Sequence, residues 1–87
     1  MQIQFSEEAW EQYLYWQTQE KRFLKRINDL LEDIGRSRHQ GTGKPEPLKG
    51  DLSGYWSRRI DDKNRLVYRL LSGGICKVIQ CKGHYDD

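Results

Sequence analysis

Hydrophobic and polar residues alternate in four segments of the chain, which predicts four strands. The alternating segments are 2–5 (QIQF), 55–60 (YWSRRI), 65–71 (RLVYRLL) and 75–82 (ICKVIQCK). Turn residues separate the last three segments, at 61–64 (DDKN) and at 72–74 (SGG). Connections this short predict that these three strands form an antiparallel meander.

Between the first strand and the meander, apolar residues recur at helical spacing. Ser6 can cap a helix over 7–19, and a second helix is predicted over 21–34 with Gly35 as its stop. The apolar stripes are Ala9, Tyr13 and Trp16, flanked by Trp10 and Leu14, in the first helix, and Phe23, Ile27, Leu30, Leu31 and Ile34 in the second. This order of elements predicts one α+β domain over residues 1–87, with the helices on one face of the sheet.

Residues 36–54 are predicted to form a long loop because they are rich in Gly, Pro, Ser and charge. Within the loop, Pro45 and Pro47 flank Glu46 and restrict the backbone there to extended conformations. We therefore expect Glu46 on a stiff extended segment, a constraint that a merely solvent-exposed glutamate would not require.

Length and composition indicate one small globular domain. The 87 residues include ten aromatic side chains (three Trp, five Tyr, two Phe), enough for a compact core. No apolar run could span a membrane and the N-terminus has no signal-peptide pattern, so the expected compartment is the cytoplasm. A domain this small is also expected to form a homodimer or to bind a partner tightly.

Charge is distributed unevenly although the net charge is only +2. Residues 1–20 hold four acidic residues and no Lys or Arg, whereas residues 36–85 hold eleven Lys or Arg against four acidic residues. This asymmetry predicts a basic face whose natural partner is a polyanion. Charge counting alone leaves an ordinary solvated surface as the alternative.

The cysteines and histidines do not predict a metal site. Cys76 and Cys81 are five positions apart in one predicted strand, which places them on opposite faces as half-buried residues that cannot form a disulfide. Neither His39 nor His84 has the spacing of a zinc ligand. No metal and no cofactor are therefore expected.

The sheet face away from the helices is predicted to be cationic. Alternation places Arg59 and Arg65 there, together with Arg69 or Lys82. Neighbouring arginines on a bare sheet repel one another unless an anion lies between them. Surface ion pairs are the alternative, with the nearby carboxylates Asp61, Asp62 and Glu46.

Glu46, Lys49, His84 and Tyr85 are expected near this face, and their chemistry suits cleavage of an RNA phosphodiester. A base must take the proton of the 2′-OH, an acid must protonate the leaving 5′-oxygen, and cations must stabilise the phosphorane. Histidine titrates near neutral pH, and tyrosine can stack on a base. The chain has no Walker, dinucleotide-binding, zinc-protease or G-x-S-x-G motif that offers competing chemistry.

Five segments, spread over nearly the whole chain, resemble the YoeB/Txe toxins of the RelE/ParE superfamily. They are 5–16 (FSEEAWEQYLYW), 41–49 (GTGKPEPLK), 52–60 (LSGYWSRRI), 65–68 (RLVY) and 84–85 (HY). The resemblance implies a RelE-like, microbial-ribonuclease-like fold and the toxin of a type II toxin–antitoxin system. Such a toxin is a metal-independent endoribonuclease (mRNA interferase) that cuts mRNA in the A site of the 70S ribosome and inhibits translation. It also implies a homodimer, a cognate YefM-type antitoxin, and transcriptional autoregulation through binding of the complex to operator DNA.

The same resemblance implies a role for each candidate residue. It implies that Glu46 is the general base and His84 the general acid. Arg65 would stabilise the phosphorane, and Tyr85 would position the substrate. Lys49 and Arg59 would be further phosphate contacts. The chain departs from the family pattern in Asp86 and Asp87, which follow the His-Tyr pair, and in Gly83, which puts the rigidity of His84 in question.

Two other functions stay open. A catalytically silent relative would act only by binding its antitoxin, operator DNA or another target such as gyrase, and would lack the set Glu46, Arg65, His84 and Tyr85. A plain RNA-binding module would need the basic face but no acid–base pair.

Overall fold

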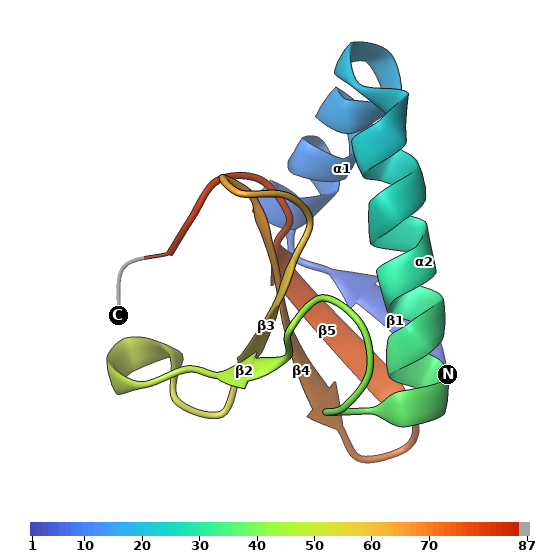
Figure 1. Cartoon of the computed structure of the whole chain (residues 1–87). Coiled ribbons are helices and arrows are strands. Elements are labelled where there is room, and N and C mark those ends of the chain that lie inside the picture. The colour runs from blue at the N-terminus through green and yellow to red at the C-terminus, as the bar shows by residue number, and fades with distance from the viewer. Residues whose placement is uncertain (86–87) are drawn as a thin grey trace.

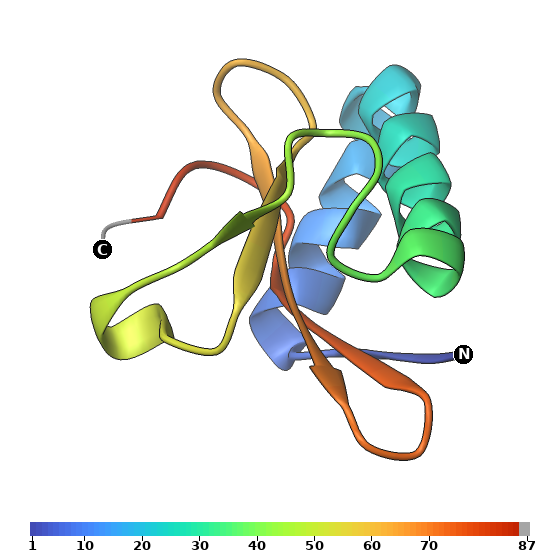
Figure 2. The ribbon, with the colours of Figure 1, turned by 60° about the horizontal axis from the view of Figure 1, so that its bottom comes forward.

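The computed structural model describes residues 1–85, so the expectation for Asp86 and Asp87 lies outside the described residues. In chain order the elements are β1 (Gln2–Phe5), α1 (Glu7–Gln19), α2 (Lys21–Ser37), β2 (Glu46–Pro47), the 3-10 helix η1 (Gly50–Leu52), β3 (Trp56–Arg59), β4 (Arg65–Leu71) and β5 (Ile75–Gln80). The two helices pack side by side on one face of the sheet, and η1 and residues 81–85 lie away from the helices (Figures 1 and 2). The predicted α+β class is confirmed.

The five-stranded sheet is mixed rather than purely antiparallel. Its order is β1-β5-β4-β3-β2, and β3, β4 and β5 form the predicted meander. β1 adds to β5 in parallel orientation, with Gln2 opposite Ile75 and Phe5 opposite Val78. At the other edge β2 pairs antiparallel with β3, which makes Glu46 part of the sheet.

The predicted loop over 36–54 contains more regular structure than its composition indicates. The predicted stop at Gly35 is wrong, because α2 continues to Ser37 and is capped by Arg38, whose φ is 56°. Gly35 lies inside the helix, where a Cβ would be 3.6 Å from Cε of Met1. β2 and η1 occupy the second half of the segment, since pairing with β3 satisfies backbone groups that a free loop would expose to water.

The core lies between the helices and the inner face of the sheet. Its buried residues come from both helices and from the second half of the chain: Ala9, Trp16, Ile27, Leu30, Leu31, Ile34, Ile60, Leu66, Tyr68, Cys76, Val78 and Cys81. The predicted stripe of α2 is therefore confirmed, whereas Trp10 and Leu14 of α1 stay 46% and 40% exposed. Within residues 1–85, the structure contains no helix with the length and apolarity needed to cross a membrane.

A β-bulge shifts the alternation of the last strand. Tyr68 pairs with Val78, but the adjacent Val67 pairs with Gln80, so Ile79 is an extra residue. A bulge of this kind bends its strand and changes the direction of the side chains that follow it. The regular strand ends at Gln80, two residues earlier than predicted, and the chain then turns toward its C-terminal end.

The bulge also overturns the prediction for the cysteines. Beyond it the inward-facing position moves by one residue, so Cys76 and Cys81 both lie in the core. Both are free and fully buried, rather than half-buried on opposite faces. Burial raises the pKa of the Cys76 thiol to about 11 and that of the Cys81 thiol to about 12. Neither residue therefore forms much thiolate at neutral pH.

Candidate active site

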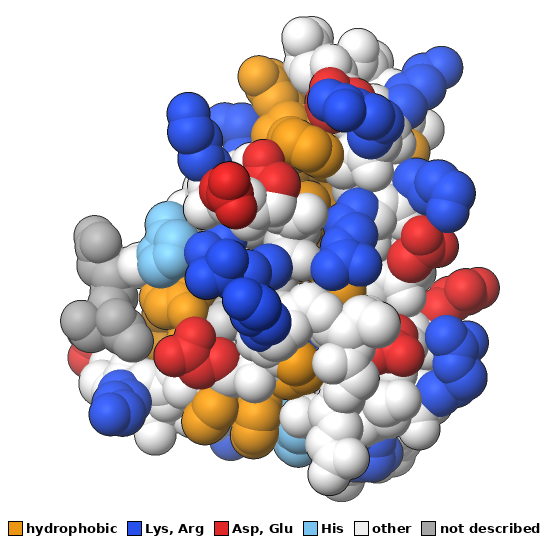
Figure 3. Space-filling view, viewed as in Figure 1, with side chains coloured by type: hydrophobic (Ala, Val, Ile, Leu, Met, Phe, Trp, Pro, Cys, Tyr) orange, Lys and Arg blue, Asp and Glu red, His pale blue; other side chains and the backbone are white. Residues whose placement is uncertain are grey.

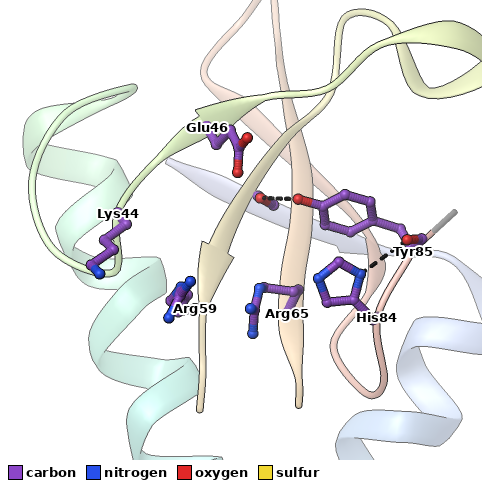
Figure 4. Close-up of a pocket in the computed structure, with 7 residues that line it drawn as sticks. Lys44, Glu46, Arg59, Arg65, His84 and Tyr85 are labelled. Atoms are coloured by element: carbon purple, nitrogen blue, oxygen red, sulfur yellow. Dashed lines mark hydrogen bonds between the residues drawn. The ribbon is translucent and has the colours of Figure 1, made fainter. Parts of the chain in front are cut away.

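A cavity of about 290 Å³ opens on the sheet face opposite the helices. It is lined by Lys44, Glu46, Ser57, Arg59, Arg65, His84 and Tyr85 (Figure 4). Figure 3 shows the same side of the molecule, where Lys and Arg side chains gather beside a histidine and a carboxylate. Five of the six residues proposed from the sequence therefore converge on one cavity. Lys49, the sixth, does not line it and lies exposed at the start of η1.

Glu46 enters the cavity from the edge of the sheet. Its β2 strand pairs with β3 so that Glu46 lies opposite Ser57. The flanking prolines restrict the backbone to the extended form that this pairing requires, which confirms the expected extended segment. In Figure 4 the Glu46 carboxylate points into the cavity from the side opposite the arginines.

Arg59 and Arg65 are cross-strand neighbours on β3 and β4. Arg65 is only 7% exposed, and its Nη1 donates to the backbone oxygens of Asp61 at 2.6 Å and Asn64 at 3.1 Å. Neither arginine forms a salt bridge with any residue from 1 to 85, although the charge of Arg65 interacts with the carboxylate of Asp61. Two adjacent guanidinium groups without a salt bridge repel each other, and an anion between them would relieve this repulsion.

The turn between β3 and β4 is fixed by the carboxylate of Asp61. Oδ1 of Asp61 accepts hydrogen bonds from the backbone N–H groups of Lys63 and Asn64 and from Nδ2 of Asn64. Burial opposes ionisation of Asp61, but these hydrogen bonds and the charge of Arg65 outweigh it and lower the pKa of the carboxyl. The turn that orients Arg65 is thereby held in one conformation.

The C-terminal segment is anchored to the same turn. The N–H of Gly83 donates to Oδ1 of Asn64 at 2.7 Å, and the N–H of Arg65 donates to the oxygen of Gly83 at 3.0 Å. Nε2 of Gln80 also donates to the oxygen of His84 at 3.0 Å. Gly83 has a φ of 79°, a conformation that glycine adopts without strain. These contacts fix the backbone that carries His84.

His84 and Tyr85 complete the cavity. The exposed His84 ring has Nδ1 3.0 Å from the oxygen of Tyr85, and its other nitrogen is directed toward Arg65 (Figure 4). The Tyr85 hydroxyl lies 3.0 Å from Oγ of Ser57, which is 2% exposed. The arrangement therefore places one carboxylate, one imidazole, cations and an oriented aromatic ring around one space.

The sequence reasoning missed two lining residues, Lys44 and Ser57. Alternation placed Ser57 on the correct face, but its contact with Tyr85 depends on the path of the C-terminal segment. Arg69 and Lys82, offered as further cations of this face, do not line the cavity. Each lies over a tyrosine ring instead, that of Tyr55 or Tyr15. Within residues 1–85, no three His, Cys, Asp or Glu side chains are grouped as ligands for a metal ion.

A fully buried arginine, Arg58, holds the loop that leads into the cavity. Its guanidinium forms an ion pair with Asp33 of α2 and donates to the hydroxyl of Tyr68. It also donates to three loop carbonyls, those of Arg38, Gln40 and Thr42. The hydrogen bond from Arg58, with one from the N–H of Thr42, lowers the pKa of the Asp33 carboxyl. Arg58 therefore connects α2, the sheet and the loop that precedes Glu46.

His39 in this loop gives the fold a testable pH dependence. Its ring stacks on Trp56 with centroids 4.3 Å apart, and burial, then the charges of Arg38 and Arg58, lower its pKa below the usual 6.5. Because this histidine is harder to protonate in the folded state than in the unfolded state, the fold loses stability as the pH falls from about 6.5 through the lower pKa of the folded state. We expect the urea midpoint to fall over this range, and to fall less in H39F, which keeps a stacking ring. Equal pH dependence in both proteins would exclude His39 as the cause.

The fold and the cavity together define a class: a small α+β protein whose sheet carries, on its outer face, a cavity lined by arginines, a glutamate and a histidine. A family model described as the YoeB-like toxin of bacterial type II toxin–antitoxin systems matches residues 5–85. Toxin YoeB of Streptomyces coelicolor is 51% identical over 85 residues, which are 98% of this chain and 100% of that protein. The chain belongs to the YoeB-like toxin family.

Solved structures agree with this membership. A YoeB/ParE toxin from Agrobacterium tumefaciens is 46% identical, with a TM-score of 0.95 over 98% of this chain and 100% of that one. YoeB of Staphylococcus aureus is 45% identical, with a TM-score of 0.90 over 98% of each chain. The latter has been solved as a dimer and as a heterotetrameric complex with YefM. The resemblance seen in the sequence is confirmed at the level of the family.

Proposed function

We propose that this chain is a ribosome-dependent endoribonuclease that cuts mRNA in the ribosomal A site and thereby inhibits translation. The observation that carries the proposal is the cavity, which brings Glu46 and His84 together around arginines that form no salt bridge within residues 1–85. A protein that only binds its partners needs neither a general base nor a general acid in such a place.

In the proposed reaction Glu46 takes the proton of the 2′-OH, and the 2′-oxygen attacks the adjacent phosphorus. Arg65, with Arg59, stabilises the additional negative charge of the phosphorane. The bond from phosphorus to the 5′-oxygen then breaks, and His84 gives its proton to that oxygen. The products are a 2′,3′-cyclic phosphate and a 5′-hydroxyl. The chain's own residues supply every proton transfer in this scheme, and no cofactor takes part.

Two further residues are proposed to bind the substrate. Tyr85, whose hydroxyl lies 3.0 Å from Oγ of Ser57, can hold a base by stacking. Lys49 stays a proposed phosphate contact that would act from outside the cavity.

Two of the proposed partners, the antitoxin and a second copy of the chain, have counterparts among the relatives. As in the Staphylococcus aureus complex, we propose that this chain binds a cognate YefM-type antitoxin, and that the pair binds operator DNA through the antitoxin. As in the Staphylococcus aureus dimer, we propose that it forms a homodimer. Its proposed place of action is the cytoplasm, on the 70S ribosome.

A purified translation system tests this function. Primer extension on an mRNA held in programmed ribosomes should map cleavage within the A-site codon, and the same mRNA without ribosomes should stay intact. Equal cleavage of naked mRNA would contradict the ribosome requirement. No cleavage in either arm would favour the binding-only alternative.

Asn64 is predicted to position His84, because its side chain joins the β3–β4 turn to Gly83. In N64A the Gly83 N–H loses its acceptor, and we expect kcat on programmed ribosomes to fall about 10- to 100-fold through misplacement of the acid. Binding to the ribosome should change less than twofold. Hydrogen exchange of the Gly83 amide checks the cause, since it should accelerate in the variant. A protected Gly83 amide together with reduced kcat would assign Asn64 some other role.

A further inference from the structure

Lys44 lines the cavity beside Arg59, although the sequence gives no reason to place it there. We propose that Lys44 binds the RNA phosphate next to the scissile one, on the side away from His84. The inference rests on the proposed function in that its ligand is RNA, and it adds a phosphate-binding residue to that site.

The backbone at Lys44 is the first observation. Its φ is 51°, in the left-handed region that side chains with a Cβ avoid at a cost. Glycine is also favoured at the preceding position, where φ is 81° and a Cβ would lie 2.9 Å from Cδ2 of Leu30 and 3.3 Å from the oxygen of Arg59. Glycine would fit the left-handed conformation at position 44 equally well, yet the chain carries lysine. A strained residue that persists where glycine would serve is typical of a functional site.

The second observation is how firmly this backbone is held. The N–H of Arg59 donates to the oxygen of Gly43 at 2.7 Å, and Arg58 donates to the oxygen of Thr42 at 3.1 Å. Pro45 follows and begins the rigid segment that carries Glu46. The Lys44 side chain therefore starts from a fixed point on the rim of the cavity.

The third observation is the arrangement of charge. Figure 4 shows the cationic side chains following one another along the cavity, from Lys44 through Arg59 to Arg65, with His84 beyond. Lys44 forms no salt bridge within residues 1–85, so its ammonium group is available to a ligand. Because the scissile phosphate must lie within reach of His84 and Arg65, a cation at the opposite end meets a flanking phosphate. A flexible ammonium group suits such a contact, which needs charge but no fixed geometry.

This position predicts an effect on affinity rather than on chemistry. K44G removes the ammonium group and the left-handed strain together. Binding of a 2′-O-methyl hexanucleotide, which cannot be cut, should weaken about five- to tenfold, and the slope of log Kd against log salt should shrink by about 0.7. The kcat on programmed ribosomes should stay within about twofold. The Tm should not fall, since relief of strain offsets the added freedom of the unfolded chain. K44R should retain the affinity of the wild type.

R38G is the matched control. Arg38 also has a positive φ, 56°, and a cationic side chain, but it lines a different hollow, beside Met1 and Leu71. The carbonyl that Arg58 binds is retained in glycine. This variant should bind the hexanucleotide like the wild type, which separates loss of a cavity charge from relief of strain.

Fluorescence anisotropy at several salt concentrations measures binding of the hexanucleotide, and cleavage on programmed ribosomes is measured alongside. Together they test the proposed role of Lys44. If K44G binds the hexanucleotide like the wild type while the wild type still cuts mRNA, the role of Lys44 is overturned and the proposed function stands. The role is also overturned if K44G and R38G weaken binding equally. If the wild type neither binds the hexanucleotide nor cuts mRNA, both proposals fail.

Discussion

H84Q should lower the rate of mRNA cleavage on the ribosome by about 10²- to 10⁴-fold, the contribution expected of a general acid. The glutamine can still form a hydrogen bond but cannot deliver a proton to the leaving 5′-oxygen. The His84 side chain is exposed and is not part of the core cluster, so the Tm should stay within about 3 °C of the wild type. Single-turnover kinetics on programmed ribosomes measure the rate, and thermal unfolding checks the fold.

E46A is the matching change for the base, and it should reduce the rate over a similar range. Glu46 is exposed and lies in an edge strand of two residues, so little stability depends on its side chain. Expression of either variant without antitoxin should no longer arrest translation. If H84Q cut mRNA at the wild-type rate, His84 would not be the acid.

R58A should destabilise the fold much more than the adjacent substitution R59A. Removing Arg58 leaves the carbonyls of Gln40 and Thr42 without their donor and the Asp33 carboxylate without its buried partner, whereas the Arg38 carbonyl keeps the Tyr68 hydroxyl. Loss of one member of a buried pair costs about 3–5 kcal/mol, which corresponds to a fall in Tm of at least about 12 °C. The R59A variant should lose less than about 0.5 kcal/mol, because the Arg59 side chain is exposed.

The small effect of R59A on stability should not extend to catalysis. The loss of one oxyanion-stabilising donor in R59A is expected to reduce kcat by about 10²-fold. Urea unfolding followed by tryptophan fluorescence gives the stability, and single-turnover cleavage gives the rate. Equal stability of R58A and R59A would show that the buried contacts of Arg58 do not hold the loop.

Elements with a periodic pattern of apolar and polar residues were predicted well from the sequence. The stripe of α2 and the alternation of β3 and β4 each rest on several residues that agree, so the core and the face carrying Arg59 and Arg65 followed directly. Glu46 was located because its two flanking prolines act locally on the backbone. Glu46 was grouped with His84 and Tyr85, which are far from it in the chain, because together their chemistry suits RNA cleavage, and the family resemblance then implied a role for each.

Features that depend on tertiary contacts could not be predicted. Arg58 looks like its neighbour in the sequence, yet its partners are backbone carbonyls of a loop, and these leave no pattern in residue types. The bulge at Ile79 shifts the alternation by one position and brings both cysteines into the core. Lys44 enters the cavity through a left-handed backbone that its residue type does not indicate.

Chemical analysis of the cut ends tests the proposed reaction most directly. RNA cleaved on programmed ribosomes by the wild-type protein should carry a 2′,3′-cyclic phosphate, or the 3′-phosphate formed from it, on the upstream fragment. The downstream fragment should carry a 5′-hydroxyl. These ends follow from attack by the 2′-oxygen with Glu46 as base and His84 as acid. A 3′-hydroxyl upstream with a 5′-phosphate downstream would mean that water attacked the phosphorus, and would contradict the mechanism assigned to this cavity.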